Sequence, residues 1–226
     1  AHDLAVAGRS VHMTRVRSMP PSDPASASLW RFWFIFLVAF VEGGAVMAVE
    51  ITGAKLVGPF YGSSLYVWAA VLALTLGGLA TGYFAGGRLS RHFPDRRALF
   101  SIILVSALLV AAMPWVAPWV MKATLGMELR LGITLSALVF LFPPLACFGM
   151  VSPLIIRLIS THRELIGRAT GTVYAISTLG GILVTFIVVF YAIPEIGMRE
   201  TLLVTAGFLA FFPLLYFSRL ARSLTG

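Results

Sequence analysis

The sequence contains little charge for its length. Only 12% of its 226 residues are charged, whereas 59% are apolar and the mean hydropathy is +0.93. A soluble domain carries about 25% charged residues, so this chain cannot cover a water-facing surface with polar groups. The composition excludes a soluble globular domain and a disordered chain, and it predicts an integral membrane protein.

Cysteine is nearly absent as well. Cys147 is the only one, so it has no partner within the chain, and a disulfide scaffold is excluded. No His or Cys lies near another at the spacing of metal ligands, and neither a G-x-S-x-G elbow nor a phosphate-binding loop occurs. We therefore expect no metal, no cofactor and no catalytic residues, and we expect that this chain is not an enzyme.

Basic residues are in excess, but they do not form a tract. The net charge is +8, yet the basic residues are scattered between apolar segments, which argues against nucleic-acid binding. Lysine is scarce, because Lys55 and Lys122 are the only lysines among 17 basic residues. An arginine bias of this kind is typical of a GC-rich bacterial genome, so we expect the bacterial inner membrane.

Apolar stretches long enough to cross about 30 Å of hydrocarbon, roughly 20 residues each, occur six times. They lack the alternation of barrel strands, so an all-α fold of six transmembrane helices is predicted. The predicted spans are residues 32–53, 64–87, 98–121, 131–158, 167–193 and 200–218. They make up a membrane domain of residues 29–219, with a disordered cytoplasmic tail of residues 1–28 before it and a short cytoplasmic tail of residues 220–226 after it.

The distribution of basic residues predicts the orientation. Thirteen of the 17 fall on one side of the predicted spans, and only Lys55, Lys122, Arg130 and Arg199 fall on the other. Because loops rich in Arg and Lys stay in the cytoplasm, both termini are expected to be cytoplasmic.

Small residues recur every four positions in two predicted helices, at Gly78, Gly82 and Gly86 and again at Gly167 and Gly171. Such stripes allow helix backbones to approach closely in lipid, so we interpret them as packing surfaces. They face either other helices of this chain, a second copy of it, or other membrane subunits. Pro143 and Pro144 remove two backbone donors and predict a kink in the fourth span.

Two carboxylates lie on the first predicted helix. Glu42 is near the middle of the membrane and Glu50 is nearer the outer end; eight residues apart, both can face one inner cavity. An ionised carboxylate in lipid costs several kcal/mol, so Glu42 should point inward, be protonated or be paired with a cation. Either Glu42, aided by Glu50, binds a proton or a cationic substrate, or Glu42 only bonds a neighbouring helix while Glu50 meets Lys55 or water.

The loop after the second predicted helix is short and basic. It contains Arg88, Arg96 and Arg97 together with one acid, Asp95. Such a turn can lock two helix ends by charge pairing, rest against anionic lipid headgroups, or serve only as a positive-inside anchor.

This loop resembles the glycine-led, arginine-rich motif of major facilitator transporters, although Ser90 stands where an acid is usual. A closer resemblance, over residues 58–68, 82–89, 174–183 and 193–197, is to the membrane domain of fused facilitator-like spermidine synthases, which are membrane-bound polyamine aminopropyltransferases. The resemblance implies a fold like one half of a major facilitator. In that family a soluble synthase domain with a Rossmann-like nucleotide site follows the helices, and this sequence has no such segment.

Three functions follow as hypotheses. The first is a transporter-like module that binds or passes a small cation, such as a polyamine, with Glu42 as the counter-charge. The second is a structural or assembly subunit of a larger membrane complex, without a substrate. The third is the membrane anchor of a split aminopropyltransferase, whose catalytic domain would lie on a partner chain.

Overall fold

The computed structural model describes residues 24–93, 95–159 and 166–225, and in this part of the chain it is helical without strands. The all-α prediction is confirmed. The helices are α1 (Pro24–Tyr61), α2 (Leu65–His92), α3 (Arg96–Thr124), α4 (Leu129–Phe140), α5 (Phe142–Ile159), α6 (Ile166–Ile187), the short π-helix η2 (Val188–Ala192) and α7 (Ile193–Thr225). Helix α1 begins before residue 29 and α7 continues past residue 219, so helix extends into both predicted tails; residues 1–23 lie outside the described part.

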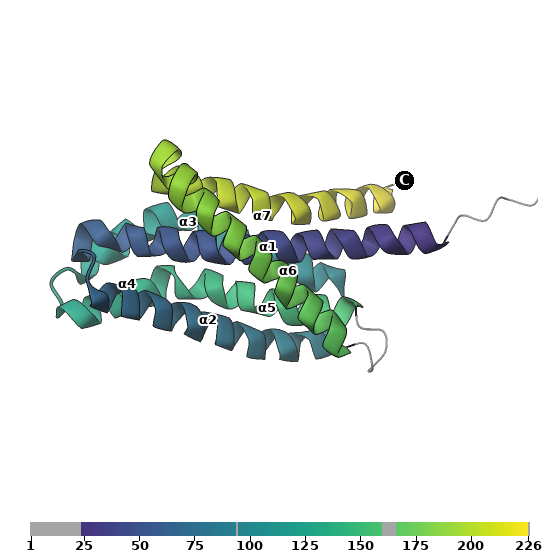
Figure 1. Ribbon diagram of the computed structural model, residues 1–226, viewed down its shortest axis with the longest axis horizontal. Helices are drawn as coiled ribbons and strands as arrows, with labels where there is room; N and C mark the ends of the chain where they lie inside the picture. The colour runs from purple at the N-terminus through teal and green to yellow at the C-terminus, as the bar shows by residue number, and fades with distance from the viewer. Residues whose placement is uncertain (1–23, 94, 160–165, 226) are drawn as a thin grey trace, which may run out of the picture.

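Five stretches of the described chain are long and apolar enough to cross a membrane: Trp33–Tyr61, Leu65–His92, Arg96–Thr124, Phe142–Ile159 and Gly167–Arg222. They make this a multi-pass membrane protein. The last stretch is 56 residues long and contains both the fifth and the sixth predicted span. Figure 1 shows that the chain reverses inside it, between α6 and α7.

Prolines and one glycine explain where the helices break. Pro143 and Pro144 cannot donate to the preceding turn, and the predicted fourth span is interrupted at Leu141, between α4 and α5. Pro194 likewise removes a donor, and the N–H of Ile193 bonds to the carbonyl of Val188 five residues back, which is the bond of a π-helix. Just beyond it, Gly197 has φ 89° and ψ 169°, a conformation open to glycine alone, and the chain turns there.

Helix α1 is the centre of the bundle and contacts all the other α-helices. Helix α6 packs mainly on α1, α2 packs on α5, and α7 packs on α3 and α1. The starts of α1, α3 and α6 and the ends of α2, α5 and α7 lie at one end of the bundle (Figure 1). We call it the basic end, because these helix ends carry most of the described arginines, and Lys55, Lys122, Arg130 and Arg199 belong to the opposite end.

The two glycine stripes have different surroundings. Gly78, Gly82 and Gly86 lie against the α5 backbone: a Cβ atom on Gly82 would collide with the Ala146 carbonyl oxygen and lie 2.7 Å from the Cα atom of Gly149. By contrast, a Cβ atom on Gly167 or Gly171 would meet nothing within 4 Å. Among the described residues nothing therefore packs on that stripe, because the start of α6 diverges from α1 toward the edge of the bundle (Figure 1).

At the opposite end, hydroxyl groups join three helices. The Thr124 hydroxyl of α3 lies 2.7 Å from the Tyr61 hydroxyl of α1 and 2.7 Å from the Ser136 hydroxyl of α4. The Thr124 hydroxyl also lies 2.9 Å from the Val120 carbonyl oxygen of its own helix, and either atom can be the donor in its bonds to Tyr61 and Ser136. We call Tyr61, Thr124 and Ser136 the Thr124 network.

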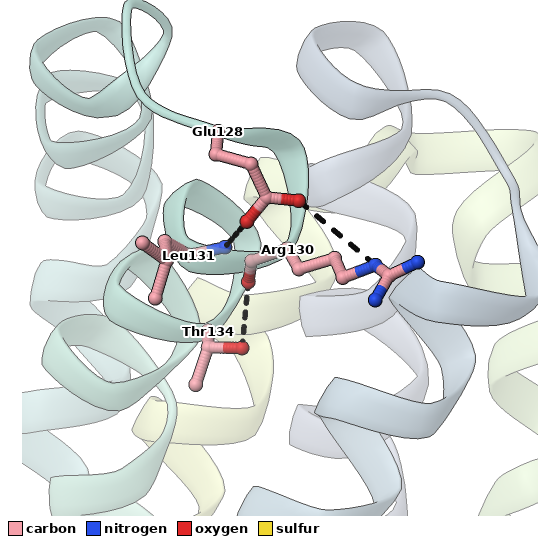
Figure 2. Close-up of polar contacts among 4 residues, drawn as sticks. All are labelled: Glu128, Arg130, Leu131 and Thr134. Carbon is pink, nitrogen blue, oxygen red and sulfur yellow. Dashed lines mark hydrogen bonds and ion pairs between the residues drawn. The ribbon is translucent and has the colours of Figure 1, made fainter.

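The start of α4 is capped by a carboxylate, as Figure 2 shows. A Glu128 oxygen accepts from the Leu131 N–H at 3.3 Å, and its other oxygen lies 3.9 Å from Nε of Arg130. Thr134 donates to the Arg130 carbonyl at 2.8 Å, and the Arg130 guanidinium also lies 5.0 Å from the Tyr66 ring of α2. Because Glu128 and Arg130 are both exposed, this ion pair contributes little to stability.

Candidate functional site

Glu42 lies in the middle of α1 and is only 4% exposed. The hydroxyl of Ser177, on α6, donates to one of its carboxylate oxygens at 3.4 Å. No described Lys, Arg or His forms an ion pair with Glu42. Hydroxyl donors usually lie 2.5–3.0 Å from their acceptors, so this bond is long, and it uses only one of the roughly four acceptor positions of a carboxylate.

Two glycine pairs bring Ser177 to Glu42. A Cβ atom on Gly43 would collide with the Ser177 carbonyl oxygen, and one on Gly180 would collide with the backbone of Phe40. Helices α1 and α6 therefore cross in backbone contact next to Glu42. The glycine pairs Gly43–Gly44 in α1 and Gly180–Gly181 in α6 are visible in the sequence and indicate close helix packing. They do not indicate which helix packs against which.

Beside this crossing is a groove of about 400 Å³ between α2 and α6. Its floor is α1, with Gly43 and Met47. Tyr83 lines the α2 side, and Tyr174, Ser177 and Thr178 line the α6 side. The groove exists because the backbones of α2 and α6, as described, do not pack on each other.

The two tyrosines approach each other across the groove. The Tyr83 and Tyr174 rings lie 6.4 Å apart, nearly perpendicular, and link α2 to α6 through side chains. Neither tyrosine was predicted as a site residue. The sequence feature that could have identified them is a tyrosine close to a glycine stripe: Tyr83 follows Gly82, and Tyr174 lies three residues after Gly171.

Glu42 lies directly behind this groove. Its neighbour Gly43 and its hydrogen-bond donor Ser177 both line the groove, whereas its carboxylate is covered. Aromatic rings attract cations through their faces, and a carboxylate supplies the opposite charge. The site therefore has the parts needed to hold a small cation: two tyrosine rings, the hydroxyls of Ser177, Thr178 and Thr185, and one buried acid.

Glu50 does not belong to this site. It is half-buried, it does not line the groove, and eight residues of helix place it about 12 Å from Glu42 along α1. The groove follows the crossing of α1 with α6, and neither carboxylate is among the residues that line it, so a cavity shared by Glu42 and Glu50 stays a prediction. Glu50 forms no ion pair with Lys55 in the described structure either.

The side chains of the basic loop after α2 lie in different environments. The guanidinium of Arg88 stacks 3.5 Å from the centroid of the Phe84 ring. Asp95 precedes α3 but makes no side-chain capping bond, and within the described residues it forms no ion pair, so the charge lock stays one of the alternatives for this loop. Arg97 is exposed, and Arg96 lines a separate cavity.

Comparisons with protein-family models, with curated proteins and with solved structures found no match for this chain. The resemblance to facilitators and to spermidine synthases stays a prediction. Within the described residues, no three His, Cys, Asp or Glu side chains gather as a metal site would require. Function is therefore argued from the geometry around Glu42.

Proposed function

We propose that this protein is a transporter-like membrane module that binds and passes a small organic cation, with Glu42 as the counter-charge. One observation carries the proposal: a carboxylate without a cationic partner among the described residues lies directly behind a groove lined by two tyrosines. An ionisable side chain buried within a membrane-spanning helix is costly, and such residues mark substrate or proton pathways.

The shape and chemistry of the groove favour an elongated amine, such as a polyamine. A volume of about 400 Å³ suits a small flexible ligand. One ammonium group would lie against the rings of Tyr83 and Tyr174, and it would replace the long hydrogen bond from Ser177 to Glu42 with an ion pair. The apolar remainder of the groove would hold the methylene segments of the ligand.

We further propose that the chain crosses the bacterial inner membrane six times with both termini in the cytoplasm, as in one half of a facilitator. Facilitator halves bind their substrate at the interface between them. The groove is open along one side, so a second copy of this chain or another membrane subunit would complete the site.

The test is spermidine binding to the purified protein in lipid nanodiscs, followed by spermidine uptake into proteoliposomes. Glu42→Gln keeps the size of the side chain and removes the charge, and we expect binding to fall by at least about tenfold, the effect of 1.4 kcal/mol. Glu50→Gln is the matched control, because it removes a carboxylate from the same helix outside the groove. If Glu42→Gln, folded by size-exclusion chromatography, bound and transported spermidine as the parent does, the proposal would be wrong.

A structural role is the second candidate, and the open surface around Gly167 and Gly171 favours it. Cβ atoms on these glycines would meet no described residue within 4 Å, and in lipid such a stripe lets another helix approach closely. An assembly subunit, or the anchor of a split aminopropyltransferase, would leave gently solubilised membranes together with larger partners or with a soluble catalytic chain. It would also bind no spermidine. Extraction as an isolated monomer would contradict both of these roles.

A further inference from the structure

A second cavity lies at the basic end, away from the Glu42 groove. Its volume is about 550 Å³, and residues of α1, α3, α5 and α7 line it. Most of its wall is apolar, but two arginines are part of it, Arg96 and Arg219. The proposed cation binding does not use this cavity, and of the basic loop after α2 only Arg96 lines it.

The two arginines mark its outer rim. Arg96 is the first residue of α3 and Arg219 lies near the end of α7. Because α7 packs on α3 and runs back along it, both residues belong to the same end of the bundle (Figure 1). The residues one turn deeper in each helix, Phe100 and Leu215, are apolar and line the same cavity.

The positive charge at the rim is not neutralised by the described protein. Neither Arg96 nor Arg219 forms an ion pair with a described acid, and no acidic side chain is part of the cavity wall. Asp95, which precedes α3, makes no side-chain bond to the first turn of the helix. The N–H groups of that turn therefore add their partial positive charge to that of Arg96.

The deeper part of the cavity is aromatic. The rings of Phe100 and Tyr216 stack with their centroids 4.6 Å apart, and Phe34 contacts Phe100 from α1 at 6.1 Å. A free anion would leave this wall facing water, and an uncharged lipid would leave the guanidinium groups without a counter-charge. An amphiphile with an anionic head satisfies both parts at once.

We propose that this cavity binds one anionic phospholipid, with its phosphate between the guanidinium groups of Arg96 and Arg219 and one acyl chain along Phe100 and Tyr216. Guanidinium groups bind phosphate oxygens through paired hydrogen bonds, and basic pockets between transmembrane helices on the cytoplasmic side hold anionic headgroups. The bound lipid would join α3 to α7, and through Phe34 to α1. This site does not depend on cation binding at Glu42.

The test uses the full-length protein, delipidated in detergent. Native mass spectrometry and thermal unfolding would follow the addition of phosphatidylglycerol, of phosphatidylcholine with the same acyl chains, or of inorganic phosphate. We expect a retained phosphatidylglycerol adduct and a raised unfolding temperature, and neither effect from phosphatidylcholine or phosphate. If phosphatidylcholine had the same effects as phosphatidylglycerol, the site would not recognise the charge of the headgroup. If inorganic phosphate had the same effects, the site would not recognise the acyl chain. Either result would overturn the proposal.

Variants locate the site. Each basic residue near an anionic lipid contributes roughly 1 kcal/mol, so Arg96→Gln and Arg219→Gln should each weaken phosphatidylglycerol binding about fivefold, and the double variant about 25-fold. Arg97→Gln is the matched control, because it removes the same charge from an exposed neighbour outside the cavity. Since Arg219 is exposed near the end of α7, its variant stays informative if Arg96→Gln does not fold. Unchanged binding by a folded Arg219→Gln, or an equal loss in Arg97→Gln, would refute the site.

Discussion

The contact between α2 and α5 can be tested at one glycine. In Gly82→Ala, the new methyl group would collide with the Ala146 carbonyl and lie 2.7 Å from the Cα atom of Gly149. Ordinary contacts of this kind begin at 3.4 Å, and both obstacles are backbone, so the helices must separate by roughly 1 Å. Overpacking of this kind costs about 1–3 kcal/mol, and we expect the upper part of that range because no side chain can rotate away.

Gly87→Ala is the control for this substitution. Gly87 lies five residues further along α2, and a Cβ atom there meets nothing within 4 Å. Alanine should therefore stabilise that position by about 0.5–1 kcal/mol, the ordinary helix preference over glycine. The two variants should differ by about 2–4 kcal/mol in the free energy of unfolding.

Equilibrium unfolding in mixed detergent micelles, followed by tryptophan fluorescence, measures this difference. With about 2–4 °C per kcal/mol for a chain of this size, thermal unfolding should separate the variants by several degrees. If Gly82→Ala proved as stable as Gly87→Ala, α2 and α5 would not approach through the glycine stripe, and the packing described for this pair would be refuted.

Three further outcomes are expected. Thr124→Val removes the hydroxyl shared by two interhelical hydrogen bonds and should cost about 1 kcal/mol in the same unfolding assay. Thr134→Val removes only an exposed bond to the backbone of its own helix and should cost less, so equal losses would contradict the role of the Thr124 network. Gly197→Ala forces a Cβ atom into a glycine-only conformation and should cost about 1–3 kcal/mol, so an unchanged unfolding temperature would contradict the turn between α6 and α7. In a cysteine-free background, Lys122→Cys should react with an impermeant thiol reagent added outside the cell and Arg97→Cys should not; the reverse pattern would invert the proposed orientation.

Features that depend on local chemistry could be predicted from the sequence. Pro143 and Pro144 predict a kink in the fourth span, because the missing N–H groups act on the same helix, and the structure has a break there between α4 and α5. The burial of Glu42 follows from the cost of a carboxylate in lipid, whichever helix covers it. The stripe at Gly78, Gly82 and Gly86 marks a close approach, and α5 occupies it in the structure.

Features that depend on which helices meet could not be predicted. The stripe at Gly167 and Gly171 has the same spacing as the stripe in α2, yet no described residue lies against it. The spacing of Glu42 and Glu50 allows a shared cavity, but only one of the two lies at the crossing of α1 with α6. Periodicity defines the face of a helix, and the partner of that face is set by the packing of the whole bundle.

Burial of Glu42 is not required by the packing around it. The close crossing of α1 and α6 is made by glycines on both helices, and the single long hydrogen bond from Ser177 adds little to it. An apolar residue at position 42 would avoid the cost of burying a carboxylate. Glu42 is buried directly behind an aromatic groove and has no cationic partner among the described residues, which is why cation binding is the function we propose.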